Sequence, residues 1–403
     1  MTEINQKQNW ELEFKLIQQT PMIHFQHDHQ GATLRASEVK PKLDKFLIKR
    51  LGGFDEVFKT HPDWFVGYFK DAEISDIKPA LNYKMRFYCE HSEVSEPPKY
   101  GLYYGNMGAR SEKEKAFFSN GNCTMSILCF NSELIDFIKR NVRKFFLVTN
   151  FGRMQDKGFG SFVVEGEYRI EDICESLAQE FDSKNVYYFE CACMGDVFKE
   201  NIFKSIKTLY SVMKSGYNIN GKYHRSFLFE YFHKKNIGNE KAYMKKEKIS
   251  PWKDGKPVEY PGSDREYSDI EADEYLYVRA LLGVGDHIDY ITDFRWDSVK
   301  NRYFPAGDKL SVSIKHNAVE RYSSPVFFNV VNDVVYFAGG RVNKNILDKE
   351  FAFENSRGES VKLKTPSEFD IDDFLEFFFA NYDPFAKGYG IGKKLRKYQG
   401  GAK

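Results

Sequence analysis

The residues best suited to chemistry in this sequence form a glycine-rich loop that could hold a phosphate group. The loop covers residues 152–161 and reads Gly-Arg-Met-Gln-Asp-Lys-Gly-Phe-Gly-Ser. Glycine permits backbone conformations closed to other residues and lets a ligand approach the main chain, and successive N–H groups in such a turn can cradle a phosphate. Arg153 and Lys157 add cationic side chains, and Phe159 is expected either to stack on a ligand or to anchor the loop. The alternative is a tight hairpin without a ligand.

The segments on either side of the loop exclude one familiar phosphate site. A dinucleotide-binding loop would be followed by a helix, whereas Gly160–Val164 is predicted to be a strand. A second short apolar strand is predicted at Phe145–Thr149, so we expect the loop to join two strands.

A second cationic feature lies where a helix is predicted to begin. Residues 31–43 read Gly-Ala-Thr-Leu-Arg-Ala-Ser-Glu-Val-Lys-Pro-Lys-Leu, and Ser37 is the expected N-cap of a helix that runs to Leu51. Unpaired N–H groups at a helix N-terminus favour anions, and Arg35, Lys40 and Lys42 surround this terminus. The alternative is a capped helix that carries surface lysines.

A histidine-rich cluster near the first predicted strand leaves catalysis open. It consists of His24, His27, Asp28 and His29. Histidine can act as a general acid–base catalyst, and His27 and His29 could hold a metal. An endoribonuclease, metal-dependent or metal-independent, is therefore one alternative, and a polar surface loop is the interpretation that we prefer. The Cys191-Ala192-Cys193 pair lacks a second pair at ligand spacing, so no metal site is expected there.

The charge of the chain reverses sharply in its middle. Lys204–Lys256 has thirteen Lys or Arg against four Asp or Glu, and Pro257–Tyr290 has nine acidic residues against two arginines. Aromatic residues alternate with lysines in the basic part, as on a nucleic acid-binding surface. The alternative is a solvated basic face that packs against the acidic segment. The residues concerned are Tyr217, Tyr223, Phe227, Phe229, Tyr231, Phe232, Lys234, Lys235, Tyr243, Lys245 and Lys246.

The elements that must position these features mix helices and strands. Strand, helix, strand, strand, helix, strand is the ferredoxin-like order, which we place over residues 10–200. Its expected parts are Trp10–Leu16, Ser37–Leu51, Leu81–Cys89, Cys123–Phe130, Ser132–Lys139 and Gly160–Val164. Farther along we expect a helix at Ile202–Met213, strands at Leu310–Ile314 and Val326–Val331, a hairpin turn at Asn332-Asp333 and a helix at Phe369–Asn381 capped by Asp370. A second glycine-rich stretch, residues 387–394, echoes the first and hints at a duplicated unit.

Length and composition limit the class of protein. The chain has 403 residues, enough for two or three domains. Its net charge of +1 means that any basic surface is local. Aromatic residues make up 16%, most of them expected in the core and some available to stack on unpaired bases. No apolar run reaches the length of a membrane span, and the polar N-terminus and six cysteines suit reduced thiols in a cytoplasmic protein.

Three motifs together resemble the RAMP superfamily of CRISPR-Cas proteins, and most of all the first RAMP subunit of the type III-B (Cmr) effector complex. Leu34–Lys40 matches the helix start Leu-Arg-x-x-Ser-(Ile/Val)-(Arg/Lys) of that subunit. Phe151–Ser161 is similar to its loop Gly-Gly-x-x-x-x-(Lys/Arg)-Gly-(Phe/Tyr)-Gly-Ser, and Arg321–Val326 to its Arg-x-x-Ser-Pro strand start. The motifs occur in the same order as in the family.

The resemblance implies an α+β protein with two RRM-like (ferredoxin-like) units and a basic, aromatic-rich insertion. We place an N-terminal RRM-like domain with the glycine-rich loop at residues 1–200. A charged, mainly helical insertion is expected at 201–295, and a C-terminal RRM-like unit at 296–403.

The resemblance also implies antiviral defence, as a non-catalytic subunit of a type III CRISPR effector ribonucleoprotein that contacts the backbone of guide or target RNA. Its partners would be RNA and other CRISPR effector subunits, with no membrane and no cofactor. A defence protein outside CRISPR that retains the RAMP fold is a further alternative. The expected RNA contacts are Arg35, Lys40, Lys42, Arg110, Gly152, Arg153, Lys157, Gly158, Phe159 and Gly160.

Overall fold

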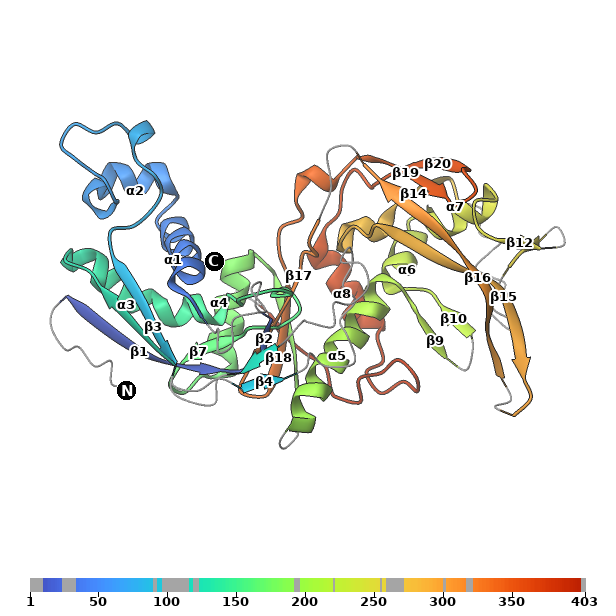
Figure 1. Cartoon of the computed structure of the whole chain (residues 1–403), viewed down its shortest axis with the longest axis horizontal. Coiled ribbons are helices and arrows are strands. Elements are labelled where there is room, and N and C mark those ends of the chain that lie inside the picture. Colours follow the sequence, from blue (N-terminus) through green and yellow to red (C-terminus); the bar gives the residue numbers. More distant parts are fainter. Residues whose placement is uncertain are drawn as a thin grey trace. The chain divides into compact units, whose positions relative to one another are not determined.

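The computed structural model of the chain separates into two compact units (Figure 1). The first comprises residues 1–99, 110–180 and 328–336, and the second comprises 100–109, 181–327 and 337–403. The structure describes residues 10–23, 34–89, 93–95, 116–118, 123–191, 196–219, 222–253, 256–258, 272–299, 302–316 and 322–399. Both units combine helices with sheets that are mostly antiparallel, in agreement with the predicted α+β class. Among the described residues, no helix is long and apolar enough to cross a membrane.

A four-stranded antiparallel sheet forms the centre of the first unit. Its order is β3-β6-β1-β7, and its strands are β1 (Glu11–Gln18), β3 (Lys84–Cys89), β6 (Cys123–Leu128) and β7 (Phe162–Val164). Alternate residues of β1, namely Leu12, Phe14 and Leu16, are buried, because successive strand side chains point to opposite faces. The predicted strands at Trp10–Leu16, Leu81–Cys89 and Cys123–Phe130 are therefore confirmed to within a few residues at their ends.

Helices and short strands complete the first unit. Helix α1 packs against α3 and β3, and α3 packs against β7. The helices are α1 (Ala36–Arg50), α2 (Phe54–Thr60), α3 (Ser132–Leu147) and α4 (Ile170–Phe181), the last of which ends at the unit boundary. A small sheet has the order β2-β5-β4, from Met22–Ile23, Ala116–Phe118 and Glu93–Ser95. Two 3-10 turns lie at Pro62–Trp64 and Ile74–Asp76.

Two predicted helix boundaries in this unit are wrong. No strand forms at Phe145–Thr149: α3 runs to Leu147, beyond its predicted end at Lys139, because Ile138, Val142 and Phe145 bury one helical face. The glycine-rich loop therefore follows a helix, not a strand. Ser37 is not an N-cap: Arg35 holds that position without a side-chain cap, and Ser37 lies exposed in the first turn.

The second unit contains several small sheets and four helices within the described residues. Its helices are α5 (Asp196–Lys214), α6 (Phe227–His233), α7 (Glu240–Lys246) and α8 (Ile371–Asn381), with 3-10 turns at Val278–Leu282 and Lys344–Ile346. Its earlier strands are β8 (Asn185–Glu190), β9 (Tyr217–Ile219), β10 (Lys222–His224), β11 (Ile237–Asn239), β12 (Trp252–Lys253), β13 (Lys256–Pro257) and β14 (Glu274–Leu276). Its later strands are β15 (His287–Asp297), β16 (Arg302–Lys315), β19 (Glu350–Asn355), β20 (Ser360–Lys364) and β21 (Arg396–Gln399).

The strands β17 (Val326–Val331) and β18 (Val334–Gly339) form the predicted hairpin. Asn332 and Asp333 join them with φ angles of 46° and 63°, the positive values that a tight type I′ turn needs. Residues 328–336 belong to the first compact unit. The strand order around the hairpin is β17-β18-β8-β21.

Most of the aromatic side chains singled out in the basic segment lie in the core. Phe227, Phe229, Tyr231 and Phe232 are buried, and the Phe227 ring lies edge-on to Phe378 of α8 with centroids 5.0 Å apart. The hypothesis that these four face a nucleic acid is therefore wrong, since all four are buried, and Phe227 and Tyr231 pack α6 onto α8.

The alternative, that the basic and acidic segments pack together, is supported by two contacts. Strand β11 of the basic part pairs in parallel with β14 of the acidic part. Arg279 forms an ion pair with Glu240, whose side chain is completely buried. In this ion pair the acid comes from the basic part and the arginine from the acidic part, so the two segments pack together without drawing on their opposite net charges.

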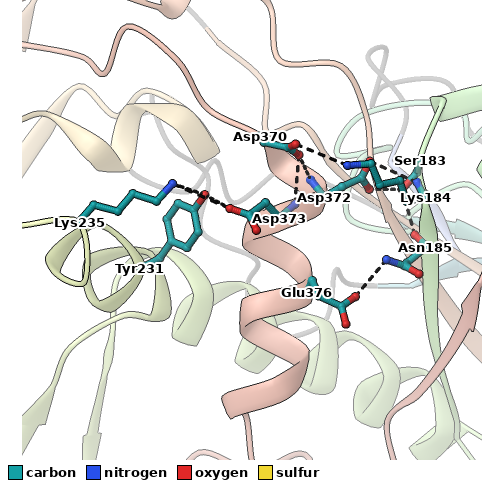
Figure 2. Close-up of polar contacts among 9 residues, drawn as sticks. All are labelled: Ser183, Lys184, Asn185, Tyr231, Lys235, Asp370, Asp372, Asp373 and Glu376. Atoms are coloured by element: carbon teal, nitrogen blue, oxygen red, sulfur yellow. Dashed lines mark hydrogen bonds and ion pairs between the residues drawn. The ribbon is translucent and has the colours of Figure 1, made fainter.

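The N-terminus of α8 gathers polar contacts from neighbouring elements (Figure 2). Asp370 accepts hydrogen bonds from the backbone N–H groups of Asp372 and Asp373 at 2.9 and 3.1 Å, which confirms the predicted cap. Ser183 Oγ donates to Asp372 at 2.7 Å, and the Tyr231 hydroxyl donates to Asp373 at 2.5 Å. These bonds tie α8 to the start of β8 and to α6.

Candidate nucleic-acid interface

The two predicted cationic motifs meet in the first unit, where α1 begins beside the glycine-rich loop. Glu38, in the first turn of α1, accepts a hydrogen bond from the backbone N–H of Gly152 at 2.6 Å. Lys42, one turn later, donates to the carbonyl oxygen of Asn150 at 3.0 Å and to Gln155 Oε1 at 2.7 Å. Burial lowers the pKa of Lys42, and the nearby Glu38 carboxylate partly offsets this shift. Helix start and loop therefore form one structure.

The glycines of the loop are required by the protein's own main chain. Gly152, Gly158 and Gly160 have φ angles of 79°, 80° and 67°, which glycine adopts without strain. A Cβ on Gly160 would lie 2.0 Å from the carbonyl oxygen of Phe151, and one on Gly152 would lie 2.5 Å from that of Ile23. Close approach to a ligand is thus not needed to explain these residues.

The backbone N–H groups of the loop already have acceptors inside the protein. Besides the Gly152–Glu38 bond, Arg153 N donates to Ile23 O at 2.8 Å, Lys157 N to Met154 O at 2.9 Å and Gly160 N to Pro21 O at 2.9 Å. A phosphate could reach these four amides only by breaking those bonds. The predicted amide cradle is therefore not formed at these positions, and side chains must provide any contact.

Two predicted contact residues in the loop point into the protein. Phe159 is buried, with 2% of its surface exposed, so of its two expected roles it anchors the loop. Lys157 is also buried, and its Nζ lies 3.0 Å from Asp156 Oδ2. Gly158 and Gly160 are buried as well.

Lys40 forms an ion pair with a buried carboxylate. Its Nζ lies 2.7 Å from Asp44 Oδ2, donates to the carbonyl oxygen of Leu81 at 2.8 Å and lies 4.3 Å from the centre of the Tyr83 ring. Burial raises the pKa of Asp44, and the contact with Lys40 opposes this shift. Lys40 therefore compensates a charge that the fold has removed from water.

Arg35 and Arg153 are the two predicted arginines at the junction between α1 and the glycine-rich loop. Both side chains are half-buried. Arg35 is the N-cap residue of α1 and Arg153 follows Gly152, so they flank the Glu38–Gly152 hydrogen bond. The positive end of a helix and two guanidinium groups suit an anion.

A buried polar network holding the loop was not predicted. Ser161 Oγ lies 2.7 Å from both Asn329 Oδ1 and the carbonyl oxygen of Val330, and its single hydroxyl proton can be donated to either acceptor. Asn329 donates through Nδ2 to Leu147 O at 2.6 Å, and Asn150 donates to Gln155 O at 2.6 Å and Phe328 O at 2.9 Å. No sequence signal links these residues, because they come from segments far apart in the chain.

Other predicted features cannot be placed in this way. Arg110, Arg321 and the cluster of His24, His27, Asp28 and His29 lie outside the described residues. Among the described residues, no group of His, Cys, Asp and Glu could hold a metal ion.

Two family models cover nearly the whole chain. The Cmr1 N-terminal domain matches residues 9–217, and the Cmr1 C-terminal domain matches residues 223–397. A search of curated proteins found no match.

Replacing Gly160 with alanine tests the close approach of its backbone to Phe151. Gly392→Ala is a matched control, because Gly392 has the same φ of +67° but nothing within 4 Å of its added Cβ. We expect the control to lose about 1 kcal/mol of stability from backbone strain, and Gly160→Ala to lose at least about 3 kcal/mol because a clash is added. Calorimetric melting of the variants measures both, and equal losses would contradict the clash.

Replacing Lys40 with methionine tests its pairing with Asp44. We expect a loss of about 3 kcal/mol in unfolding free energy at neutral pH, because the Asp44 charge stays buried without its cation. The pKa of Asp44, already raised, would rise further; protonated Asp44 needs no cation, so the loss should shrink as pH falls through that pKa. Urea unfolding at several pH values measures this effect. In an Asp44→Asn background, Lys40→Met should cost far less, and an equal cost there would show that Asp44 is not the partner.

Proposed function

We propose that this chain, which belongs to the Cmr1 family and is thus a subunit of the type III-B CRISPR effector, binds the backbone of guide or target RNA without cleaving it. The family matches confirm the resemblance predicted from the three sequence motifs. RNA binding in a cytoplasmic ribonucleoprotein is our inference from the site.

The observation that carries the proposal is the junction between α1 and the glycine-rich loop. Arg35 and Arg153 flank the bond from Gly152 N to Glu38, and the N-terminus of α1 has no side-chain cap. Guanidinium groups bind phosphate oxygens through paired N–H groups. We infer that these two arginines are the phosphate contacts. Lys40, Lys42, Lys157, Gly152, Gly158, Phe159 and Gly160 hold the junction in shape, and Arg110 remains a predicted contact.

The strand orders support an RRM-like fold for both halves of the chain. In the first unit, the chain order of the main elements is β1, α1, β3, β6, α3, β7. The four strands among them form a sheet in the order β3-β6-β1-β7. Later in the chain, β8-α5-β17-β18-α8-β21 give the order β17-β18-β8-β21, which is the same arrangement. In each case the glycine-rich stretch lies between the second helix and the last strand. We infer a duplicated RRM-like unit, with the segment between α5 and β17 as the insertion.

Removing the two arginines tests the RNA contact. Arg35→Ala with Arg153→Ala should weaken binding of single-stranded RNA and reduce the slope of log affinity against log salt by about 1.4, because two phosphate contacts are lost. Lys59→Ala with Lys70→Ala is the charge-matched control, since both lysines are exposed in or after α2. Fluorescence anisotropy at several salt concentrations measures both quantities. Unchanged affinity and slope in the arginine variant would refute the proposed contact.

Absence of cleavage is a separate prediction. We expect end-labelled single-stranded RNA to stay intact when incubated with the purified chain, with or without divalent metal ions. His27→Ala should then behave like the unchanged protein on a denaturing gel. Cleavage that disappears in His27→Ala would instead favour the endoribonuclease alternative.

A further inference from the structure

Strands β15 and β16 form a long antiparallel hairpin in the second unit, drawn as the paired orange arrows in Figure 1. Strand β19 pairs with β16 only from Val312 to Lys315. Among the described strands, the part of β16 before Val312 therefore has β15 as its only partner. We call residues 293–297 and 302–306 the outer arm. A two-stranded ribbon is only marginally stable in water, so a covered face would stabilise it.

A bulge separates the outer arm from the base of the hairpin. Ile291 is paired with Lys309, whereas Asp293 is paired with Ala306, so Gly307 and Asp308 together lie opposite Thr292. Gly307 has a φ of 77°, and the Thr292 hydroxyl donates to the carbonyl oxygen of Asp308. Bulges bend and twist a ribbon, so the outer arm is turned relative to the base of the hairpin.

One face of the outer arm is aromatic and uncharged. Trp296 is paired directly with Tyr303, and their rings meet edge to face with centroids 4.9 Å apart. Phe294 lies two residues before Trp296 and so on the same side. Trp296 is 49% exposed and Tyr303 is 37% exposed. We call Phe294, Trp296 and Tyr303 the aromatic face.

The opposite face carries the described charges. Arg295 is paired with Phe304 there, and Asp293 and Asp297 lie on the same side. Phe304 is 40% exposed. The two faces of one ribbon thus differ in chemistry while sharing the same backbone.

We propose that the aromatic face docks into an apolar groove on another protein subunit of the effector complex. This proposal rests on the Cmr1 family membership and not on the proposed RNA contact. Trp and Tyr surrounded by a polar rim are the residues that dominate binding energy at protein interfaces. An exposed aromatic patch on a projecting ribbon fits such an anchor.

The charge of the outer arm favours a protein over RNA as the occupant. Residues 293–306 contain Asp293 and Asp297 against Arg295, Lys300 and Arg302. A polyphosphate backbone is bound by a clear excess of cations, and two aspartates beside the aromatic residues would repel it. A neutral apolar groove with polar edges matches this nearly balanced rim.

The experiment compares two cross-strand pairs on opposite faces of the arm. Trp296→Ser with Tyr303→Ser removes the two paired rings of the aromatic face, and Arg295→Ser with Phe304→Ser is the control, the neighbouring cross-strand pair on the opposite face. Each full-length variant is co-expressed with the other effector subunits, one of which carries an affinity tag, and the amount of this chain that co-purifies is measured. We expect about a tenfold loss for the aromatic pair and none for the control. The isolated aromatic variant should bind RNA as the unchanged chain does.

A second measurement leaves the aromatic face intact. Val299, at the tip of the hairpin, is 92% exposed, and a benzophenone amino acid placed there should cross-link to a protein subunit in the assembled complex. Full incorporation of the aromatic variant, or cross-links to RNA alone, would overturn the proposal. So would a dimer of the isolated chain that Trp296→Ser with Tyr303→Ser converts to a monomer. Loss of RNA affinity on changing Arg35 and Arg153, by contrast, would leave this proposal untouched.

Discussion

The close contact between Gly160 and Phe151 is the constraint on which the candidate site depends. Phe151 N donates to Gly160 O at 3.0 Å, and no Cβ fits at position 160. Because Phe151 and Gly160 are held in contact, the residues between them, 152–159, must form a closed loop. Phe151 itself is buried among the rings of Phe145, Phe146 and Phe162. The position of Arg153 is thus set by packing in the core of the first unit.

The loop also depends on residues far away in the sequence. Ser161 and Asn329 are fully buried and hydrogen-bonded to each other, and a buried polar group left without a partner costs about 1–3 kcal/mol. Asn329 Nδ2 in turn donates to the carbonyl oxygen of Leu147, the last residue of α3. A glycine-rich motif copied without the hairpin of β17 and β18 would therefore lack the bonds that fix its shape.

Sequence patterns predicted most elements of the fold because those elements have clear periodicity or turn chemistry. The alternation in β1, the Asn332-Asp333 turn and the Asp370 cap are examples, since each depends on neighbouring residues only. The prediction of a strand at Phe145–Thr149 is wrong because a short apolar run is typical of a buried helix end as well as of a strand. The prediction of Ser37 as the N-cap is wrong because the helix begins at Ala36, which makes Arg35, two residues before Ser37, the N-cap residue.

The candidate site was harder to predict because the role of a cation depends on what lies beside it after folding. Lys40 and Lys42 have the same local pattern as surface lysines, yet one compensates the buried Asp44 and the other bonds the glycine-rich loop. The aromatic residues of α6 likewise resemble stacking residues until α8 covers them.

These assignments limit how strongly the first unit could bind RNA by itself. Moving Lys40 toward a phosphate would leave the Asp44 carboxylate buried and unpaired, and such a charge costs about 3–5 kcal/mol. The ion pair with Asp44 therefore opposes a contact between Lys40 and a phosphate. In the proposed RNA contact, Arg35 and Arg153 would provide the electrostatic attraction at this junction, and two cations are few for a polyanion. A chain with so few contacts gains most from being held beside other subunits on the same RNA, because linked sites bind far more tightly together than alone. Under the proposed function, protein contacts that fix the chain in the complex would therefore add to the RNA affinity that the two arginines provide.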